Sequence, residues 1–208
     1  MSEEHAQYPW LFKGAYAIYG GTSKVKPLPG EVEINSRIEV EDIDLANKRV
    51  KLRVHSSATS RVWRLSKKIS EEDVADWVKI GDKVIPSDTP YVLEGEYEGV
   101  MRFGGLGMRR CIAQLCSLPK STMVVLWDKE FDWPLEFISI FRYIRERSHS
   151  MSDDLGSMLR DVIKGVFQMP SSSTENMRST VKKSKSEIVR EYSLVISLKE
   201  TNIPGLKC

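Results

Sequence analysis

The sequence predicts an α+β fold, in which a large curved antiparallel β-sheet, a half-barrel-like meander, carries two helices packed on it. Two observations predict this. Apolar and polar residues alternate with a period of two through most of the first two thirds of the chain, as in half-buried strands. Near residues 70–79 and 153–168 the apolar residues instead recur with the spacing of an amphipathic helix. We expect residues 1–208 to form a single domain, with residues 9–145 making the sheet core and the first helix.

The first strands come from three alternating segments. In WLFKGAYAIYG, residues 10–20, one face carries Trp10, Phe12, Gly14, Tyr16 and Ile18, and the strand is expected to end at a glycine pair. Residues 31–42 and 48–55 then form a hairpin. Matching their apolar rows sets Glu39 and Glu41 opposite or diagonal to Arg49, Lys51 and Arg53. Because this pairing neutralises a basic row that resembles a nucleic-acid surface, we expect no nucleic-acid partner.

The stretch SEEDVADWVKIG, residues 70–81, carries the signals of a short helix. Ser70 is a good N-cap, Asp73 occupies the capping-box position and Gly81 can end the helix. Val74, Trp77 and Val78 form its apolar stripe.

Alternation resumes at Tyr91, and Gly95 and Gly99 lie on the apolar face, where glycines usually mark a bulge, a bend or a close approach. The glycine-rich turn FGGLG (residues 103–107) follows. STMVVLW (121–127) and WPLEFISIFRYI (133–144) are then two strands joined by DKEFD (128–132). Since they are apolar on both faces, we expect them to be central and covered on both sides.

The last third of the chain changes character. Residues 150–169 contain the amphipathic helix, which begins near Ser152 and ends before Pro170. A mobile Ser/Lys-rich loop is expected at 170–186, and residues 187–199 form a strand that returns to an edge of the sheet.

Composition excludes several classes of function. The 31 basic and 29 acidic residues give a net charge of +2, too small to favour an anionic partner. The N-terminus is acidic where a secretory signal would be basic, and the longest membrane candidate, Met123–Trp127, is far shorter than the roughly 20 residues of a spanning helix. We expect a cytoplasmic protein without a membrane span. The three cysteines form no zinc-like spacing, so no metal or cofactor is predicted.

The densest group of chemical side chains is Asp128, Glu130, Asp132 and Glu136, in and beside the DKEFD turn. Their spacing partly resembles an EF-hand loop, but Trp133 stands where the glycine is needed. A carboxylate pair in one short turn has no walls to desolvate it, so we interpret these residues as solvated turn residues. An enzyme built from dispersed carboxylates ranks last among the functions considered, and no catalytic residue is assigned.

The aromatic residues favour a different function, a non-enzymatic binding module for an apolar small molecule or lipid held between the sheet and the helix. The candidate ligand-binding residues are Trp10, Phe12, Tyr16, Tyr97, Phe103, Trp133, Phe137, Leu159 and Ile163. The alternative is a protein–protein interaction or scaffold protein with a solid core, which could form a homodimer through an exposed edge strand.

Residues 91–143, with the WDKEFDWPLEF hairpin before a closing strand, resemble LolA-type lipoprotein-carrier half-barrels. The resemblance implies a curved sheet and a helical lid around a lipid-sized cavity. A DKxTG-style turn is common in that family, and Phe131 and Asp132 stand here in place of its Thr-Gly pair.

Overall fold

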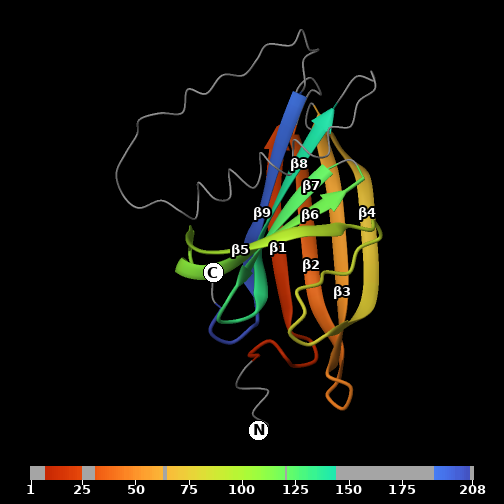
Figure 1. The fold of residues 1–208 in the computed structure, drawn as a ribbon. Coiled ribbons are helices and arrows are strands. Elements are labelled where there is room, and N and C mark those ends of the chain that lie inside the picture. The colour runs from red at the N-terminus through yellow and green to blue at the C-terminus, as the bar shows by residue number, and fades with distance from the viewer. Residues whose placement is uncertain (1–7, 25–30, 63–64, 120, 144–189, 207–208) are drawn as a thin grey trace, which may run out of the picture.

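A computed structural model describes residues 8–24, 31–62, 65–119, 121–143 and 190–206 of the chain (Figure 1). These residues form an all-β structure of nine strands in one antiparallel sheet. The strands are β1 (Tyr16–Lys24), β2 (Glu31–Asp44), β3 (Arg49–Val62), β4 (Leu65–Lys79), β5 (Val92–Phe103), β6 (Gly107–Leu118), β7 (Ser121–Asp128), β8 (Trp133–Tyr143) and β9 (Arg190–Thr201). The predicted antiparallel half-barrel is therefore confirmed, but the α+β class is wrong for the described part of the chain.

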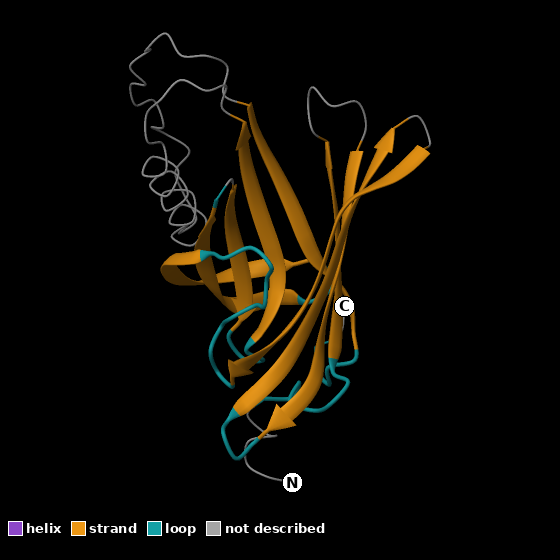
Figure 2. Cartoon of the chain, turned by 90° about the vertical axis from the view of Figure 1, so that its right-hand side faces the viewer, coloured by secondary structure: helices purple, strands orange, loops and turns teal. Residues whose placement is uncertain are grey.

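The order of the strands is β4-β3-β2-β1-β9-β8-β7-β6-β5. Two meanders, β1 to β4 and β5 to β8, are thus joined through the last strand, β9, which pairs with both β1 and β8. The expectation that this strand returns to an edge is wrong, because it holds the centre of the sheet. The sheet curls strongly, and β5 runs across the direction of the other strands (Figure 1, Figure 2).

The predicted helix at 70–79 is the clearest correction. These residues belong to β4, which pairs with β3 from Val62↔Leu65 to Arg49↔Lys79. Val74 and Val78 turn inward, and Val78 is buried. Capping signals are a weak prior, and a short helix is marginal by itself, so the continuous ladder offered by β3 decides the conformation. The predicted helix at 150–169, its amphipathic part at 153–168 and the loop at 170–186 lie outside the described residues.

The first strand differs from the prediction in its start and its faces. It begins at Tyr16, and Ala17 and Tyr19, both fully buried, point inward. Pairing with β2 sets Ala17 opposite Ile38, which faces the core. The glycine pair lies inside the strand, where a Cβ at Gly21 would stand 2.0 Å from the carbonyl oxygen of Val195 in β9. Glycine there allows the close approach of β1 to β9.

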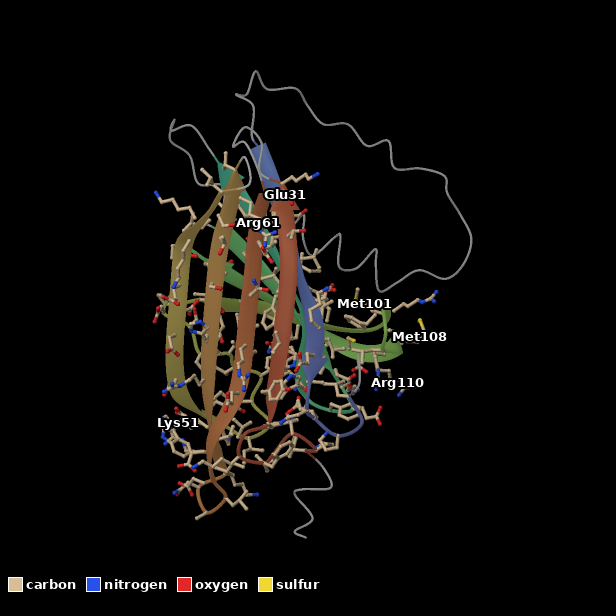
Figure 3. All side chains as sticks on the ribbon, turned by 180° about the vertical axis from the view of Figure 1, so that it is seen from behind. Glu31, Lys51, Arg61, Met101, Met108 and Arg110 are labelled. Carbon is tan, nitrogen blue, oxygen red and sulfur yellow. The ribbon has the colours of Figure 1, made fainter. Side chains whose placement is uncertain are left out.

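The β2–β3 hairpin is confirmed, and its charge pairing is confirmed in part, because Glu39 pairs with Arg37 of its own strand and Arg49 lies over the Trp77 ring of β4. Glu41 in β2 accepts ion pairs from Lys51 and Arg53 in β3, each at 2.8 Å. Glu33 and Arg61 form a further pair toward the opposite end of the hairpin, and Figure 3 shows Arg61 and Lys51 at these two ends. Lys51, Arg53 and Arg61 of β3 are therefore matched by acidic groups of β2.

The central hairpin is also confirmed: Val124 to Trp127 of β7 are all buried, whichever face they occupy. The core includes both faces of this hairpin as well as the concave face of the half-barrel. Its largest side chains touch through their rings, with centroids 5.4 Å apart for Trp10 and Trp133 and 5.1 Å apart for Tyr19 and Phe137. The turn between β5 and β6 forms as predicted, with Gly107 at a φ of 73°.

Candidate ligand cavity

The connection between β4 and β5, residues 80–91, lies against the concave face. Lys83 Nζ forms an ion pair with Asp132 at 2.8 Å, and both side chains are more than four-fifths buried. The backbone N–H of Asp88 donates to Glu72 Oε1 at 2.6 Å. These two contacts attach the connection to the sheet near its start, at Lys83, and near its end, at Asp88. The connection therefore forms a wall over part of the half-barrel.

Beside the first part of this connection, the concave face is packed solid. Trp10 and Trp133 are 4% and 2% exposed, and Val50 is fully buried. The gap left among them, next to Val84 and Ile85 of the connection, measures about 20 Å³, room for one water molecule. This part of the face therefore holds the core and no ligand.

Farther along the strands, the same face contains a cavity of about 170 Å³. Its walls come from both halves of the sheet, β2, β3 and β4 on one side and β7, β8 and β9 on the other, with residues 85–87 and Tyr91 at its border. Its main apolar lining residues are Ile34, Ile38, Val54, Met123, Phe137 and Ile196. A cavity of this size and lining is typical of sites that hold a small apolar group.

A few polar groups face the same space. Ser36 and Ser56 lie opposite each other on β2 and β3, and their hydroxyl oxygens are 2.7 Å apart. Ser139 adds a hydroxyl from β8, and Glu72 is the one charged residue among the described lining residues. Burial raises the pKa of the Tyr91 hydroxyl, which keeps it protonated and able to donate to the backbone oxygen of Ile85. The polar groups are thus mostly hydroxyls. Those of Ser36, Ser56 and Tyr91 already have hydrogen-bond partners, and a hydroxyl such as that of Ser139 can hydrogen-bond to an uncharged polar group of a ligand.

The candidate aromatic residues do not converge on one place. Phe137 lines the cavity, whereas Trp10 and Trp133 belong to the solid part of the core. Tyr16 lies outside the core, with the Arg37 guanidinium 4.4 Å from its ring centroid and its hydroxyl donating to Glu200.

Three other described candidates lie elsewhere. Phe103 borders a separate hollow with Leu135 near the β5–β6 turn, and Phe12 and Tyr97 are partly buried against the core. Leu159 and Ile163 lie outside the described residues.

Sequence reasoning missed the aliphatic and serine positions of the cavity, among them Ile34, Ser36, Met123 and Ile196. Ile34 and Ser36 stand on the inward row of β2, so the alternation contains their signal. Which inward rows face one another depends on the curl of the sheet and on the central position of β9, and local periodicity reports neither.

The carboxylates of the DKEFD turn have structural partners. Asp128 is 1% exposed, and its Oδ1 accepts hydrogen bonds from the backbone N–H groups of Glu130 (2.8 Å) and Phe131 (3.1 Å). Glu136 accepts one from the Ser197 hydroxyl at 2.7 Å. The interpretation of these residues as solvated is therefore wrong for Asp128, a buried acceptor that shapes the turn, and for Asp132, whose side chain is 17% exposed and pairs with Lys83. It is right for Glu130, whose side chain is 77% exposed. In the described ranges no group of three or more His, Cys, Asp or Glu side chains could hold a metal ion.

Comparison with models of protein families, with curated proteins and with solved structures finds no match to this chain. The resemblance to LolA-type carriers therefore stays a prediction. Within the part of the chain that the structure describes, no helix has the length and apolar character to cross a membrane.

Proposed function

We propose that this protein is a non-enzymatic binding module for an apolar or lipid-like ligand, whose apolar end occupies the cavity on the concave face of the half-barrel. The observation that carries the proposal is the cavity of about 170 Å³ with aliphatic and aromatic walls from both halves of the sheet. Interiors are normally close-packed, and the neighbouring part of the same face is packed in that way. A space of this size beside a solid core favours a binding role.

The volume limits the ligand. A cavity of roughly 150 Å³ holds a benzene-sized group, whereas drug-sized ligands need about 300 Å³ or more. One aromatic ring or a short alkyl chain therefore fits, and the rest of a longer molecule extends out of the cavity. Each buried methylene contributes about 0.8 kcal/mol, which is about a fourfold gain in affinity per carbon.

The test is a homologous series. Primary n-alcohols of increasing length compete with a neutral fluorescent naphthylamine probe for the purified protein. We expect the affinity to rise by about fourfold per methylene while the chain enters the cavity, and to level off once the cavity is full. A probe that gains no fluorescence, or an affinity that does not depend on chain length, contradicts the proposal.

Two adjacent residues of β9 supply a matched pair of variants. Ile196 lines the cavity, whereas Val195 is 43% exposed on the other side of the strand. Ile196→Trp fills the cavity and is expected to abolish alcohol binding, and Val195→Trp is expected to leave it unchanged. Equal loss in both variants would show that the probe binds elsewhere. Native mass spectrometry of the purified protein then shows whether an apolar molecule is retained from the host.

A further inference from the structure

The two edges of the sheet differ in how they are protected. Edge strands expose unpaired backbone groups, and charged side chains along the strand are a common guard against pairing with another chain. Strand β4 is guarded in this way, with charges spread along its length at Lys67, Lys68, Glu71, Glu72, Asp73, Asp76 and Lys79. Strand β5 carries Glu94, Glu96 and Glu98 in its first part, but its last part, GVMRF (residues 99–103), contains one charged residue, Arg102.

This end of β5 is also apolar and exposed. Val100 is 51% exposed, and its diagonal neighbour Met108 on β6 is 65% exposed. Figure 3 shows Met101, Met108 and Arg110 at the side of the sheet opposite Lys51. Among the described residues no strand pairs with the outer edge of β5. An edge with these properties favours pairing with a further strand.

We propose that β5 pairs with β5 of a second copy of this chain, antiparallel and about a two-fold axis at Val100. Residues directly opposite each other in a sheet point to the same face, and residues on one face of a strand are two positions apart. A two-fold axis between two copies of the same strand must therefore pass through a residue and not between two residues. With Val100 on the axis, the opposed pairs are Val100 with Val100, Met101 with Gly99, Arg102 with Glu98, and Phe103 with Tyr97.

Charge complementarity selects this register. It brings Arg102 of each copy opposite Glu98 of the other and forms two symmetric ion pairs. An axis at Glu98 would oppose two like charges, and one at Gly99 would set the exposed Val100 against Glu98. Glu98 already binds Lys129 Nζ at 2.6 Å, but its side chain is 56% exposed and can receive a second cation.

This proposal is independent of the proposed ligand, because no residue of β5 or β6 lines the cavity. The pairing would join two half-barrels into one continuous sheet without using a residue that lines either cavity. Failure of ligand binding therefore says nothing against the dimer, and failure of dimerisation says nothing against the ligand.

Sedimentation velocity over a range of micromolar concentrations tests the dimer. We expect a concentration-dependent monomer–dimer equilibrium for the natural chain. Arg102→Glu turns both ion pairs into like-charge pairs and is expected to weaken the dimer by about tenfold or more. Glu98→Arg is expected to do the same, and the double variant Glu98→Arg with Arg102→Glu is expected to restore dimerisation. Rescue by the double variant also shows that the single variants did not simply unfold.

Cross-linking tests the register. Facing residues of antiparallel strands have Cα atoms about 4.5–5.5 Å apart, which suits a disulfide. In a background with Cys208→Ser, Val100→Cys is expected to form a covalent dimer on oxidation, and Gly99→Cys is not. A chain that stays monomeric at every concentration, a double variant that does not recover, or cross-linking at residue 99 in place of residue 100 overturns the proposal. A monomer whose β5 edge binds an extended peptide overturns it as well.

Discussion

Replacement of Asp128 by alanine is expected to destabilise the fold by about 3 kcal/mol. The buried carboxylate accepts two hydrogen bonds from backbone N–H groups, those of Glu130 and Phe131. Hydrogen bonds to a charged group contribute about 1.5–3 kcal/mol each, and an orphaned buried donor costs about 1–3 kcal/mol. We take about 3 kcal/mol, the lower end of what two such hydrogen bonds contribute together. The lower end applies because the N–H of Glu130 is only partly buried and can hydrogen-bond to water in the variant.

The measurement is equilibrium unfolding in urea, followed by tryptophan fluorescence. With a slope of about 2 kcal/mol per molar, the midpoint is expected to fall by about 1.5 M. Asp128→Asn keeps an oxygen for the two donors and loses the charge facing Arg109, which lies 3.7 Å away, so it is expected to cost about 1 kcal/mol.

Glu130 in the same turn is the matched control. Its side chain is 77% exposed, and Glu130→Ala is expected to change the free energy of unfolding by less than about 0.5 kcal/mol. If Asp128→Ala costs no more than Glu130→Ala, the carboxylate does not shape the turn and the reasoning is refuted. Calcium that stabilises the natural chain, but not the Asp128→Ala variant, would also refute it, because the turn would then be a metal site.

Three further results are expected. Burial raises the pKa of the Cys111 thiol to about 12 and that of Cys116 to about 11, so in a variant lacking the terminal cysteine neither reacts with Ellman's reagent at pH 8 until the protein is unfolded. The hydrogen bond from Lys51 and the charge of the nearby Arg53 lower the pKa of the Glu41 carboxyl below 4.5. The ionised carboxylate therefore stabilises the folded state fully above pH 4.5, and this stabilisation is lost as the pH falls through the lowered pKa. In urea titrations, Glu41→Gln is expected to lower the free energy of unfolding at pH 7 and to leave it unchanged near pH 2. Ser36→Ala leaves the Ser56 hydroxyl without its hydrogen-bond partner and is expected to lower the free energy of unfolding by about 1 kcal/mol. The double variant Ser36→Ala with Ser56→Ala removes both hydroxyls and is expected to be nearly neutral in the same titration.

The charge pattern of the hairpin shows what local sequence can predict. Glu41, Lys51 and Arg53 were expected to pair, opposite or diagonally, because alternation identifies each inward row and a short turn leaves few registers that bury both rows. The same reasoning predicted β7 and β8 and the turn between them. In these two hairpins the pairing is a local event, and local sequence predicted it correctly.

The segment at 70–79 shows where this reasoning fails. Ser70 and Asp73 satisfy the rules for the start of a helix, yet both lie in a strand paired with β3. The preference of a capping box amounts to about 1 kcal/mol, and a full ladder of hydrogen bonds with a neighbouring strand outweighs it. No pattern within residues 70–79 reports that β3 offers a free edge.

By itself the sequence determined the β2–β3 hairpin with its inward rows, the β7–β8 hairpin, and the pairing of Glu41 with Lys51 and Arg53, because each depends on residues close together in the chain. Only the tertiary structure decided that β9 joins the two meanders and that Ile34 and Ile196 face the same cavity. These contacts join residues far apart in the chain, and their geometry comes from the curl of the whole sheet. Periodicity within a strand carries no record of that curl.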